Sequence, residues 1–199
     1  TSPVSPNRTV IYLIALVLGG LIPFGIIYLI NFFDNKVKSR LDIERNTTIP
    51  FIGDVPKADN PNEIIQLNSR TNTAEAIRII RTNLEFLLKD VQEGVAKTIF
   101  VTSTFPKEGK TFVSVNLAST IALSDKKVLL VGLDIRNPKI DNYLQVPTVG
   151  LTNYLSSNKY NSIDELIVKI DNYSNFYVLP AGIIPPNPAE LLMDKKVGK

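Results

Sequence analysis

One stretch of the chain, Thr9–Phe33, contains no charged residue, and 19 of its 25 positions are hydrophobic. An α-helix of that length extends roughly 37 Å, which exceeds the hydrocarbon core of a bilayer at about 30 Å. The stretch is also longer than the apolar region of a secretory signal, which usually has about 7–15 residues. We therefore predict a transmembrane helix over residues 9–33, with a buried helix of a soluble core as the alternative.

The charges that flank this apolar stretch predict its orientation. Lys36, Lys38 and Arg40 follow it, whereas Arg8 is the basic residue that precedes it. Because basic residues accumulate on the cytoplasmic side of membrane helices, the carboxyl-terminal side is expected in the cytoplasm. Residues 1–8 would then be an extracytoplasmic stub, and we expect the chain to be a piece of a longer protein.

Residues 34–72 have the pattern of a juxtamembrane segment and linker. Asp34–Asn46 is charged and is expected to prolong the membrane helix for a few turns. Thr47–Lys57 has the proline and glycine residues of an extended linker, and Asp59–Asn72 is polar and loop-like.

From Thr73 onward the chain has the pattern of a globular domain, which we assign to residues 73–199. Apolar residues first recur at helical spacing, namely Ile77, Ile80, Leu84 and Leu87. Charged residues occupy the other faces, so the pattern predicts an amphipathic helix of about 17 residues.

The following segments alternate between strand-like and helix-like patterns. The β-branched and aromatic run Thr98–Thr102 is followed by a loop, Ser103–Gly109, and by helical periodicity over Lys110–Leu123. A turn at Ser124–Lys127 leads to the apolar run Val128–Val131. Strand, helix and strand in this order form the βαβ pattern. It predicts an α/β fold with a P-loop-type parallel sheet that helices cover on both faces.

Three more elements are predicted towards the carboxyl-terminal end. Ile163–Ile170 has a helical pattern, Phe176–Leu179 has the pattern of a strand, and Pro188–Asp194 opens another helix with proline at its first position. We expect the sheet formed by these elements to be incomplete.

Composition narrows the chemistry of the chain. Its 199 residues include neither cysteine nor histidine, which excludes a disulfide scaffold, thiolate catalysis, cysteine zinc ligands and serine–histidine hydrolysis. From Asp34 onward, 21 basic and 19 acidic residues leave a net charge of +2. Because surfaces that follow a phosphate backbone need clustered excess charge, we expect no nucleic acid among the partners.

The loop before the second predicted helix contains a phosphate-binding motif. Residues 104–111 match G-x-x-x-x-G-K-[ST] at Gly109, Lys110 and Thr111, and Thr104 replaces the first glycine. A loop that enters a helix presents unpaired N–H groups to phosphate. Lys110 can reach the β- and γ-phosphates, and the Thr111 hydroxyl can bind Mg²⁺. We predict nucleotide binding here, with a chance match on a solvated turn as the alternative.

A single carboxylate follows the apolar run Val128–Val131. Asp134 comes just after its end, and residues at the carboxyl ends of parallel strands collect at the ligand-binding edge of a sheet. We therefore expect Asp134 beside the phosphate loop, where it can hold Mg²⁺ or accept a proton from an attacking hydroxyl. Because Asn137-Pro138 follows, the alternative is a turn cap on a surface loop.

Together these residues resemble the bacterial tyrosine kinases (BY-kinases) that are fused to polysaccharide co-polymerases. The resemblance covers nearly the whole chain. It rests on the membrane helix and on five further segments, namely the proline-containing leader, the charged motif Glu75-x-x-Arg78-x-x-Arg81, Ser103–Thr111, Val128–Arg136 and Gly182–Leu192.

The resemblance implies roles for the loop and for the turn after the second strand. In the family the Walker A loop binds ATP, and the matching residues here are Phe105, Pro106, Lys107, Glu108, Gly109, Lys110 and Thr111. Lys110 would act on the phosphates, and Thr111 and Asp134 would hold Mg²⁺. Asp134 would also activate the acceptor tyrosine hydroxyl. The family usually has D-x-D at this turn, whereas this chain has Gly132 in place of the first aspartate.

Glu75, Arg78 and Arg81 lie at intervals of three residues, which places them on one stripe of the predicted helix. In the family the equivalent motif contacts the neighbouring subunit of a ring, so the resemblance implies a homo-oligomer interface. A solvated charged face with weak pairing inside the helix is the alternative.

The resemblance implies a membrane-anchored, ATP-dependent protein-tyrosine kinase, an autokinase, that regulates the chain length and export of capsular polysaccharide or exopolysaccharide. Its location would be the bacterial inner membrane, crossed once by this fragment, with residues 73–199 as the start of a cytoplasmic kinase-like domain. Its partners would be the polysaccharide polymerase and export machinery. A Walker B strand ending in aspartate and a cluster of tyrosines are expected beyond residue 199.

Two other functions stay open. Gly132 favours an ATP-binding assembly component of a polysaccharide co-polymerase with weak or no catalysis. A partition-type ATPase shares the deviant phosphate loop, but such proteins carry a lysine near the start of the loop, where this chain has Phe105, and they lack an integral membrane helix.

Overall fold

The computed structural model describes residues 8–34, 36–37, 39–92, 94–193 and 195–198. The chain divides into two compact units, Thr1–Phe51 and Ile52–Lys199. The second unit contains both helices and strands, as the sequence predicts for an α/β domain.

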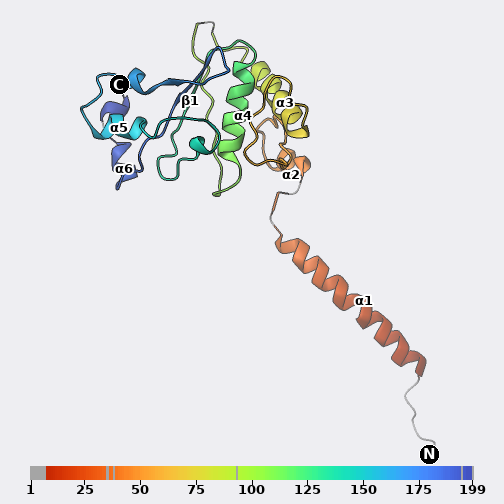
Figure 1. Cartoon of the computed structure of the whole chain (residues 1–199). Helices are drawn as coiled ribbons and strands as arrows, with labels where there is room; N and C mark the ends of the chain where they lie inside the picture. The colour runs from red at the N-terminus through yellow and green to blue at the C-terminus, as the bar shows by residue number, and fades with distance from the viewer. Residues whose placement is uncertain (1–7, 35, 38, 93, 194, 199) are drawn as a thin grey trace, which may run out of the picture. The chain divides into compact units, whose positions relative to one another are not determined.

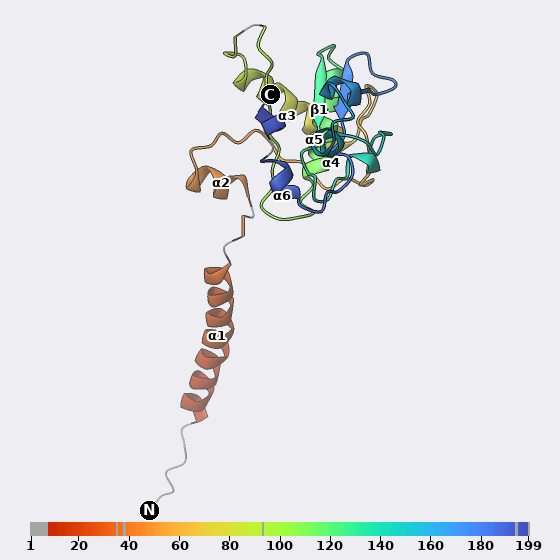
Figure 2. The ribbon, with the colours of Figure 1, turned by 90° about the vertical axis from the view of Figure 1, so that its left-hand side faces the viewer.

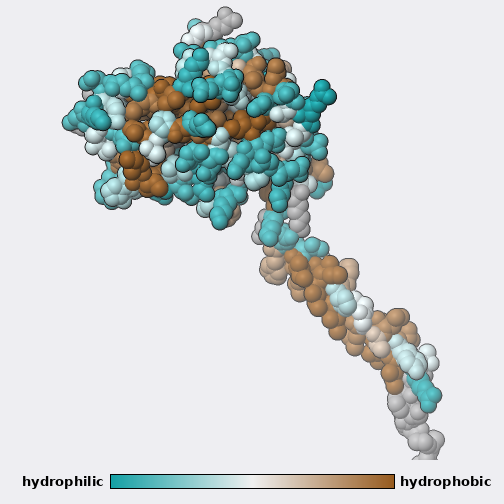
Figure 3. Space-filling view, in the orientation of Figure 1, coloured by the Kyte–Doolittle hydropathy of each residue, from teal (hydrophilic) through white to brown (hydrophobic). Residues whose placement is uncertain are grey.

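A single long helix, α1, dominates the first unit (Figure 1). It runs over Arg8–Phe33 and contains 26 residues, with Pro23 in its interior. Every residue of α1 is exposed or half-buried, and hydrophobic side chains cover most of its length (Figure 3). The predicted helix is confirmed, and α1 is long and apolar enough to cross a membrane.

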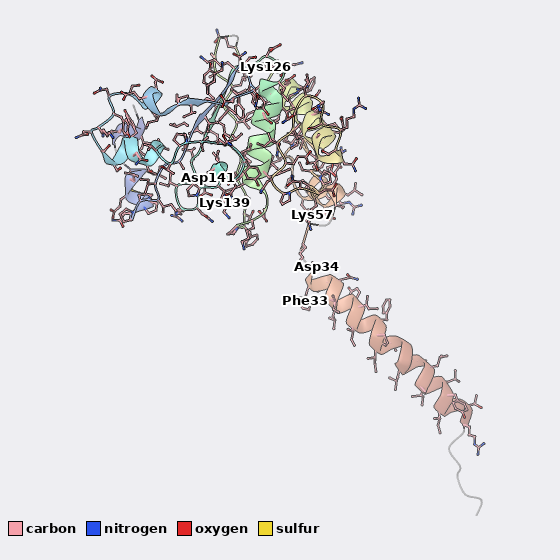
Figure 4. All side chains as sticks on the ribbon, viewed as in Figure 1. Phe33, Asp34, Lys57, Lys126, Lys139 and Asp141 are labelled. Carbon is pink, nitrogen blue, oxygen red and sulfur yellow. The ribbon has the colours of Figure 1, made fainter. Side chains whose placement is uncertain are left out.

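The membrane-length helix does not continue into the charged segment as predicted. Phe33 is its last residue, and Asp34 already lies outside it (Figure 4). The Asp34 carboxylate accepts a hydrogen bond of 3.2 Å from the Lys36 backbone N–H. A local bond of this kind competes with helical hydrogen bonding, which gives a physical reason for the break. Lys38 lies outside the described residues.

A separate short helix, α2, follows the break at Arg40–Asn46. Its first turn is capped by Ser39, whose backbone N–H donates to the Asp42 carboxylate at 2.9 Å. A new cap means that the charged segment starts its own helix instead of extending α1.

The sheet of the second unit is mixed, not all-parallel as predicted. It contains β1 (Val128–Val131), β2 (Val168–Lys169) and β3 (Phe176–Leu179) in the order β1-β3-β2. β1 pairs parallel with β3, with Val128 opposite Phe176. β2 pairs antiparallel with β3, with Val168 opposite Val178. The strand predicted at Phe176–Leu179 is confirmed and lies in the centre of the sheet.

The antiparallel strand explains why the predicted helix Ile163–Ile170 is wrong. Only its first turn is helical, as the 3₁₀ segment η2 over Ile163–Leu166. The chain then enters β2 and returns to β3 through a short turn, in which Asn172 has a φ of 66°. A connection this short joins antiparallel strands only, because a parallel pair needs a crossover of a dozen or more residues.

Two helices build the layers beside the sheet (Figure 1, Figure 2). The helix α4, Lys110–Ala122, packs Val115 and Ala118 against Phe176 and Val178 of β3. On its other side lies the helix α3, Asn72–Leu87. Its Ala74, Ile77 and Ile80 form a core cluster with Leu117 of α4 and with Ile65 from the preceding loop. Both predicted helices are confirmed within two residues at each end.

The remaining elements are short. They are η1 (Ile140–Asn142), α5 (Leu151–Ser156), α6 (Pro188–Leu191) and η3 (Lys195–Gly198). α5 packs Leu151 and Leu155 with Leu166 and Leu179 in a separate small core. α6 starts at the predicted proline but ends earlier than predicted, and Asp194 lies outside the described residues.

The predicted first strand of the βαβ unit is wrong. Thr98–Thr102 forms no strand in the structure, although all its residues are described. The side chain of Phe100 is 78% exposed. β1 instead pairs with β3, so Thr98–Thr102 has no ladder partner among the described strands. A strand is stable only where a neighbour satisfies its N–H and C=O groups, which composition cannot reveal.

One face of β1 is also left open. Leu129 is 47% exposed and Val131 is exposed as well, whereas Val128 and Leu130 are half-buried. Figure 3 shows hydrophobic surface over the part of this unit where Figure 1 places β1. The expected cover on both faces of the sheet is therefore absent over β1 in the described part of the chain.

Candidate phosphate-binding site

The predicted phosphate loop enters α4 through two residues with left-handed backbone. Lys107 has a φ of 68°, and Gly109, which caps the helix, has a φ of 89°. Gly109 adopts this conformation readily because it has no side chain, whereas at Lys107 it carries a steric cost. The turn makes Lys110 and Thr111 the first two residues of α4.

The start of α4 is open to an anion. Gly109 has no side chain that could accept a bond from the first helical N–H groups, and the described residues provide no other side-chain cap. A β-carbon built on Gly109 would have no described atom within 4 Å. Unpaired N–H groups and the positive end of the helix dipole therefore face free space, an arrangement that fits a phosphate group.

Lys110 and Asp134 meet at this end of the fold. The Lys110 ammonium lies 2.7 Å from one Asp134 carboxylate oxygen, and the two side chains are 36% and 32% exposed. The other oxygen accepts a hydrogen bond of 3.1 Å from the Asn137 backbone N–H. Asp134 is thus both the turn cap and the neighbour of the loop that the sequence left as alternatives.

The contacts of Asp134 set its protonation. Burial raises the pKa of the carboxyl group, but hydrogen bonds from Lys110 and from the Asn137 and Arg136 backbone, together with the lysine charge, lower it. The net result is a pKa below the ordinary value of an aspartate. Asp134 is therefore an anion at neutral pH, the form in which a carboxylate can accept a proton.

A second carboxylate of the chain binds the phosphate loop itself. The Glu108 carboxylate accepts a hydrogen bond of 3.1 Å from the Phe105 backbone N–H. The Phe105 carbonyl in turn accepts a bond of 3.0 Å from the Ser103 hydroxyl. An N–H group at the start of the loop is thereby engaged by an acidic side chain. The sequence motif indicated that Glu108 lies in the loop but not that it closes onto it.

Gly132 leaves no room for the aspartate that the family usually has there. A β-carbon on it would stand 2.8 Å from the Ala181 backbone nitrogen and 3.2 Å from the Ile140 side chain. Separations under 3 Å require the backbone to move. The glycine therefore accompanies a close approach between the end of β1 and the chain after β3.

The site fits a cation that arrives with phosphate better than a cation held by protein alone. Within the described ranges there is no group of three or more acidic or histidine side chains that could hold a metal. Mg²⁺ is commonly bound by one or two protein oxygens, with phosphate oxygens and water completing its six ligands. The Asp134 carboxylate and the Thr111 hydroxyl have the chemistry for those protein positions.

Comparison with known proteins gives clear relatives, although no protein-family model matches the chain. Tyrosine-protein kinase YwqD of Bacillus subtilis is 40% identical over 135 residues, which cover 67% of this chain and 54% of that protein. Tyrosine-protein kinase etk of Escherichia coli strain K12 is 34% identical over 166 residues, covering 82% of this chain and 19% of that protein. The solved kinase domain of Escherichia coli ETK has a TM-score of 0.66 and 28% identity, over 81% of this chain and 66% of that chain.

The chain belongs to the bacterial tyrosine kinases. This membership confirms the predicted resemblance to the family, and the solved kinase domains confirm the α/β fold class. The tyrosine-kinase chain spans about half of YwqD and about a fifth of etk. It also spans about two thirds of the solved ETK kinase domain.

In this tyrosine-kinase chain, Arg78 of the charged α3 motif is engaged within its own domain. Its guanidinium contacts the Glu75 carboxylate at 2.5 Å. It also donates to three backbone carbonyls of the loop before α3, those of Gln66 and Leu67 at 3.3 Å and of Ser69 at 2.8 Å. Arg78 therefore holds this loop against the helix, a contact outside the helix that helical spacing could not predict.

Arg81 is engaged as well. Its guanidinium donates a bond of 3.0 Å to the Thr120 carbonyl of α4, and its Nε lies 3.8 Å from the Glu85 carboxylate. Glu85 also pairs at 2.8 Å with Lys126, which Figure 4 labels. Glu75 remains the most accessible member of the motif, with a side chain 61% exposed. The structure therefore does not present the three residues as one free charged face.

Proposed function

We propose that the chain is the membrane-anchored, nucleotide-binding part of an ATP-dependent protein-tyrosine kinase, an autokinase. The observation that carries the proposal is the contact of 2.7 Å between Lys110 and Asp134 at the start of α4. It places a phosphate-binding cation and a single carboxylate beside the open N–H groups of a helix. That combination is what phosphoryl transfer from ATP requires.

In the proposed reaction the loop residues Phe105–Thr111 hold the phosphates of ATP. The tyrosine hydroxyl oxygen forms a bond to the γ-phosphorus, while the bond between that phosphorus and the β,γ-bridging oxygen breaks. ADP leaves with the bridging oxygen, and the tyrosyl proton goes to the Asp134 carboxylate. Lys110 stabilises negative charge on the phosphates. Thr111 and Asp134 would hold Mg²⁺, which supplies charge neutralisation at the phosphate oxygens.

The membrane context of the proposal rests on α1 and on the relatives. α1 has the length and apolar surface of a membrane span, with Lys36 and Arg40 after it. The positive-inside rule then places residues 73–199 in the cytoplasm, on the inner face of the bacterial inner membrane. The polysaccharide polymerase and export machinery, implied by the family resemblance, are the proposed partners.

The proposal includes the predicted homo-oligomer, with Glu75 as the main contact residue of the charged motif. We place Glu75 at the contact with a neighbouring subunit, because its carboxylate is the accessible end of the Glu75–Arg78 pair. Arg78 pairs with Glu75 and holds the loop before α3, and Arg81 holds α3 to α4. In a ring built in this way, the two arginines fix Glu75 and its helix in position and also contact the neighbouring subunit.

A second candidate function is an ATP-binding assembly component without kinase activity. Gly132 favours it, because the close approach to Ala181 removes the place of a second carboxylate. The two functions are separated by incubating the full-length natural protein with labelled ATP, beside Lys110→Ala and Asp134→Ala variants. Phosphotyrosine that depends on both residues supports the kinase. Nucleotide binding without phosphotyrosine supports the assembly component.

A further inference from the structure

Lys110 is the residue expected to bind phosphate, yet its ammonium already has an anionic partner. The Asp134 oxygen lies 2.7 Å from the Lys110 nitrogen, so it competes with a phosphate oxygen for the same ammonium group. The second Asp134 oxygen is tied to the Asn137 backbone, so the carboxylate is fixed in place. A nucleotide must therefore compete with a carboxylate that the fold itself supplies.

We propose that Asp134 is an inhibitory partner of Lys110 that nucleotide carrying a divalent cation displaces readily and that metal-free nucleotide displaces poorly. The proposal rests on the nucleotide site proposed above, but not on kinase activity. Metal-free phosphate brings only negative charge to a pair that is already neutral, and it is repelled by Asp134. A divalent cation on the phosphates gives Asp134 an alternative partner, which frees Lys110 for a phosphate oxygen.

Gly132 makes this competition dependent on one carboxylate. Among the described residues, Asp134 is the acidic side chain that forms an ion pair with Lys110. The close approach of Ala181 to Gly132 excludes a second carboxylate at the position two residues earlier. One substitution is therefore sufficient to release the lysine.

A carboxylate also engages a hydrogen-bond donor at the start of the phosphate loop. The Glu108 carboxylate accepts a bond from the Phe105 N–H, which is a donor of the same loop. Both a lysine and a backbone donor of the site are thus engaged by carboxylates of the chain. This contact is a second observation that carboxylates of the chain compete with phosphate for donors of the site.

The test measures ADP binding by calorimetry, once in EDTA and once with Mg²⁺, on the full chain. Asp134→Asn removes the charge and keeps the shape. Asp141→Asn, an exposed aspartate in η1, controls for the general loss of a negative charge. Asp134→Glu keeps the charge and tests whether a carboxylate is what matters. Thermal unfolding of each variant shows that it is folded.

In EDTA, Asp134→Asn is expected to bind ADP about fivefold more tightly than wild type, the size typical of a partly exposed ion pair. With Mg²⁺ the same variant is expected to bind more weakly than wild type. Asp134→Glu and Asp141→Asn are expected to stay near the wild-type affinity in EDTA. Unchanged EDTA affinity in Asp134→Asn overturns the proposal, and so does equal tightening in Asp141→Asn.

The outcome is separable from that of the proposed kinase. Tighter ADP binding of Asp134→Asn in EDTA, without any phosphotyrosine in the full-length protein, would support the inhibitory pair and contradict the kinase. Phosphotyrosine that depends on Lys110, together with unchanged EDTA affinity in Asp134→Asn, would support the kinase and contradict the inhibitory pair. If Asp134→Asn does not fold, Asp134→Ala, which also removes the carboxylate, takes its place. A ratio of ADP affinities with and without Mg²⁺ that is as large in Asp134→Ala as in wild type overturns the proposal.

Discussion

The side-chain oxygen of Asn116 in α4 accepts a hydrogen bond of 2.8 Å from the Ile65 backbone N–H, and both residues are fully buried. The amide nitrogen of Asn116 also donates to the Glu63 and Phe112 carbonyls, each at 3.0 Å. Asn116 therefore fastens the loop that precedes α3 to the helix that begins with Lys110. This buried polar contact connects the loop before α3 with α4, the helix that follows the phosphate loop.

The buried hydrogen bonds of Asn116 predict a large loss of stability when this residue is substituted. Asn116→Leu keeps a similar volume but leaves the Ile65 N–H and the Glu63 carbonyl buried without partners. Each such group costs about 1–3 kcal/mol, so the free energy of unfolding is expected to fall by roughly 2–5 kcal/mol. Urea denaturation measures it. The control is Asn175→Leu, whose amide bonds an exposed carbonyl at 3.3 Å. Equal losses in the two variants would contradict the account.

Gly132 predicts that restoring the family's D-x-D sequence damages the fold. In Gly132→Asp the added β-carbon meets the Ala181 backbone at 2.8 Å, so the end of β1 must separate from the chain after β3. Overpacking of this kind typically costs about 1–3 kcal/mol. We expect a lower thermal midpoint and no gain in tyrosine phosphorylation. A variant with wild-type stability and higher activity would show that the close approach is not rigid.

The contacts of the charged motif predict different roles for Arg78, which stabilises the fold, and for Glu75, which contacts a neighbouring subunit. Two variants distinguish these roles. Arg78→Ala releases the loop carbonyls of Gln66 and Ser69, so the free energy of unfolding is expected to fall by about 1–3 kcal/mol. Glu75→Ala changes an exposed side chain, so stability should stay within about 0.5 kcal/mol. Analytical ultracentrifugation of the full-length protein should then show weaker assembly in Glu75→Ala. Intact assembly in that variant would exclude Glu75 from the subunit contact.

Tyr173 predicts a loss of stability in alkaline solution. Burial raises the pKa of its hydroxyl, a hydrogen bond with Ser119 lowers it, and the net pKa lies above the ordinary value. The folded state therefore favours the neutral phenol. This contribution is complete below the pKa of the unfolded chain, about 10, and is lost as pH rises through the higher folded pKa.

The measurement is the urea midpoint at steps from about pH 8 to about pH 11. Wild type should lose stability across the upper part of this range. Tyr173→Phe should lose less, because it has no proton to release. Parallel curves for the two proteins would contradict the assignment.

Local patterns predicted those parts of the fold that local interactions form. The periodic apolar residues of α3 and α4 placed both helices, because an amphipathic helix needs only its own sequence and one packing partner. Asp134 could be placed beside the phosphate loop because residues that follow the carboxyl end of a parallel strand collect at the ligand-binding edge of a sheet. Thr98–Thr102 could not be placed, because a strand depends on a neighbour that may come from any part of the sequence.

The site contacts that the sequence did not predict join different elements of the fold. Arg78 reaches the loop before α3, Arg81 reaches α4, and Gly132 faces Ala181. None of these contacts has a periodic signature, since each depends on how finished elements pack. The one available signal was Asn116, a polar residue among apolar neighbours in a buried helix. Such a residue must find partners, but the sequence does not say which.

The central claim is that Lys110 and Asp134 form the ATP site of a protein-tyrosine kinase. The most direct measurement is transfer of the γ-phosphate of labelled ATP to tyrosine in the full-length natural protein, with the phosphoamino acid identified. Wild type is compared with Lys110→Ala and with Lys139→Ala, a lysine in the loop after β1 that Figure 4 labels. The account predicts phosphotyrosine in wild type and Lys139→Ala and its loss in Lys110→Ala. Phosphotyrosine that persists in Lys110→Ala would contradict it.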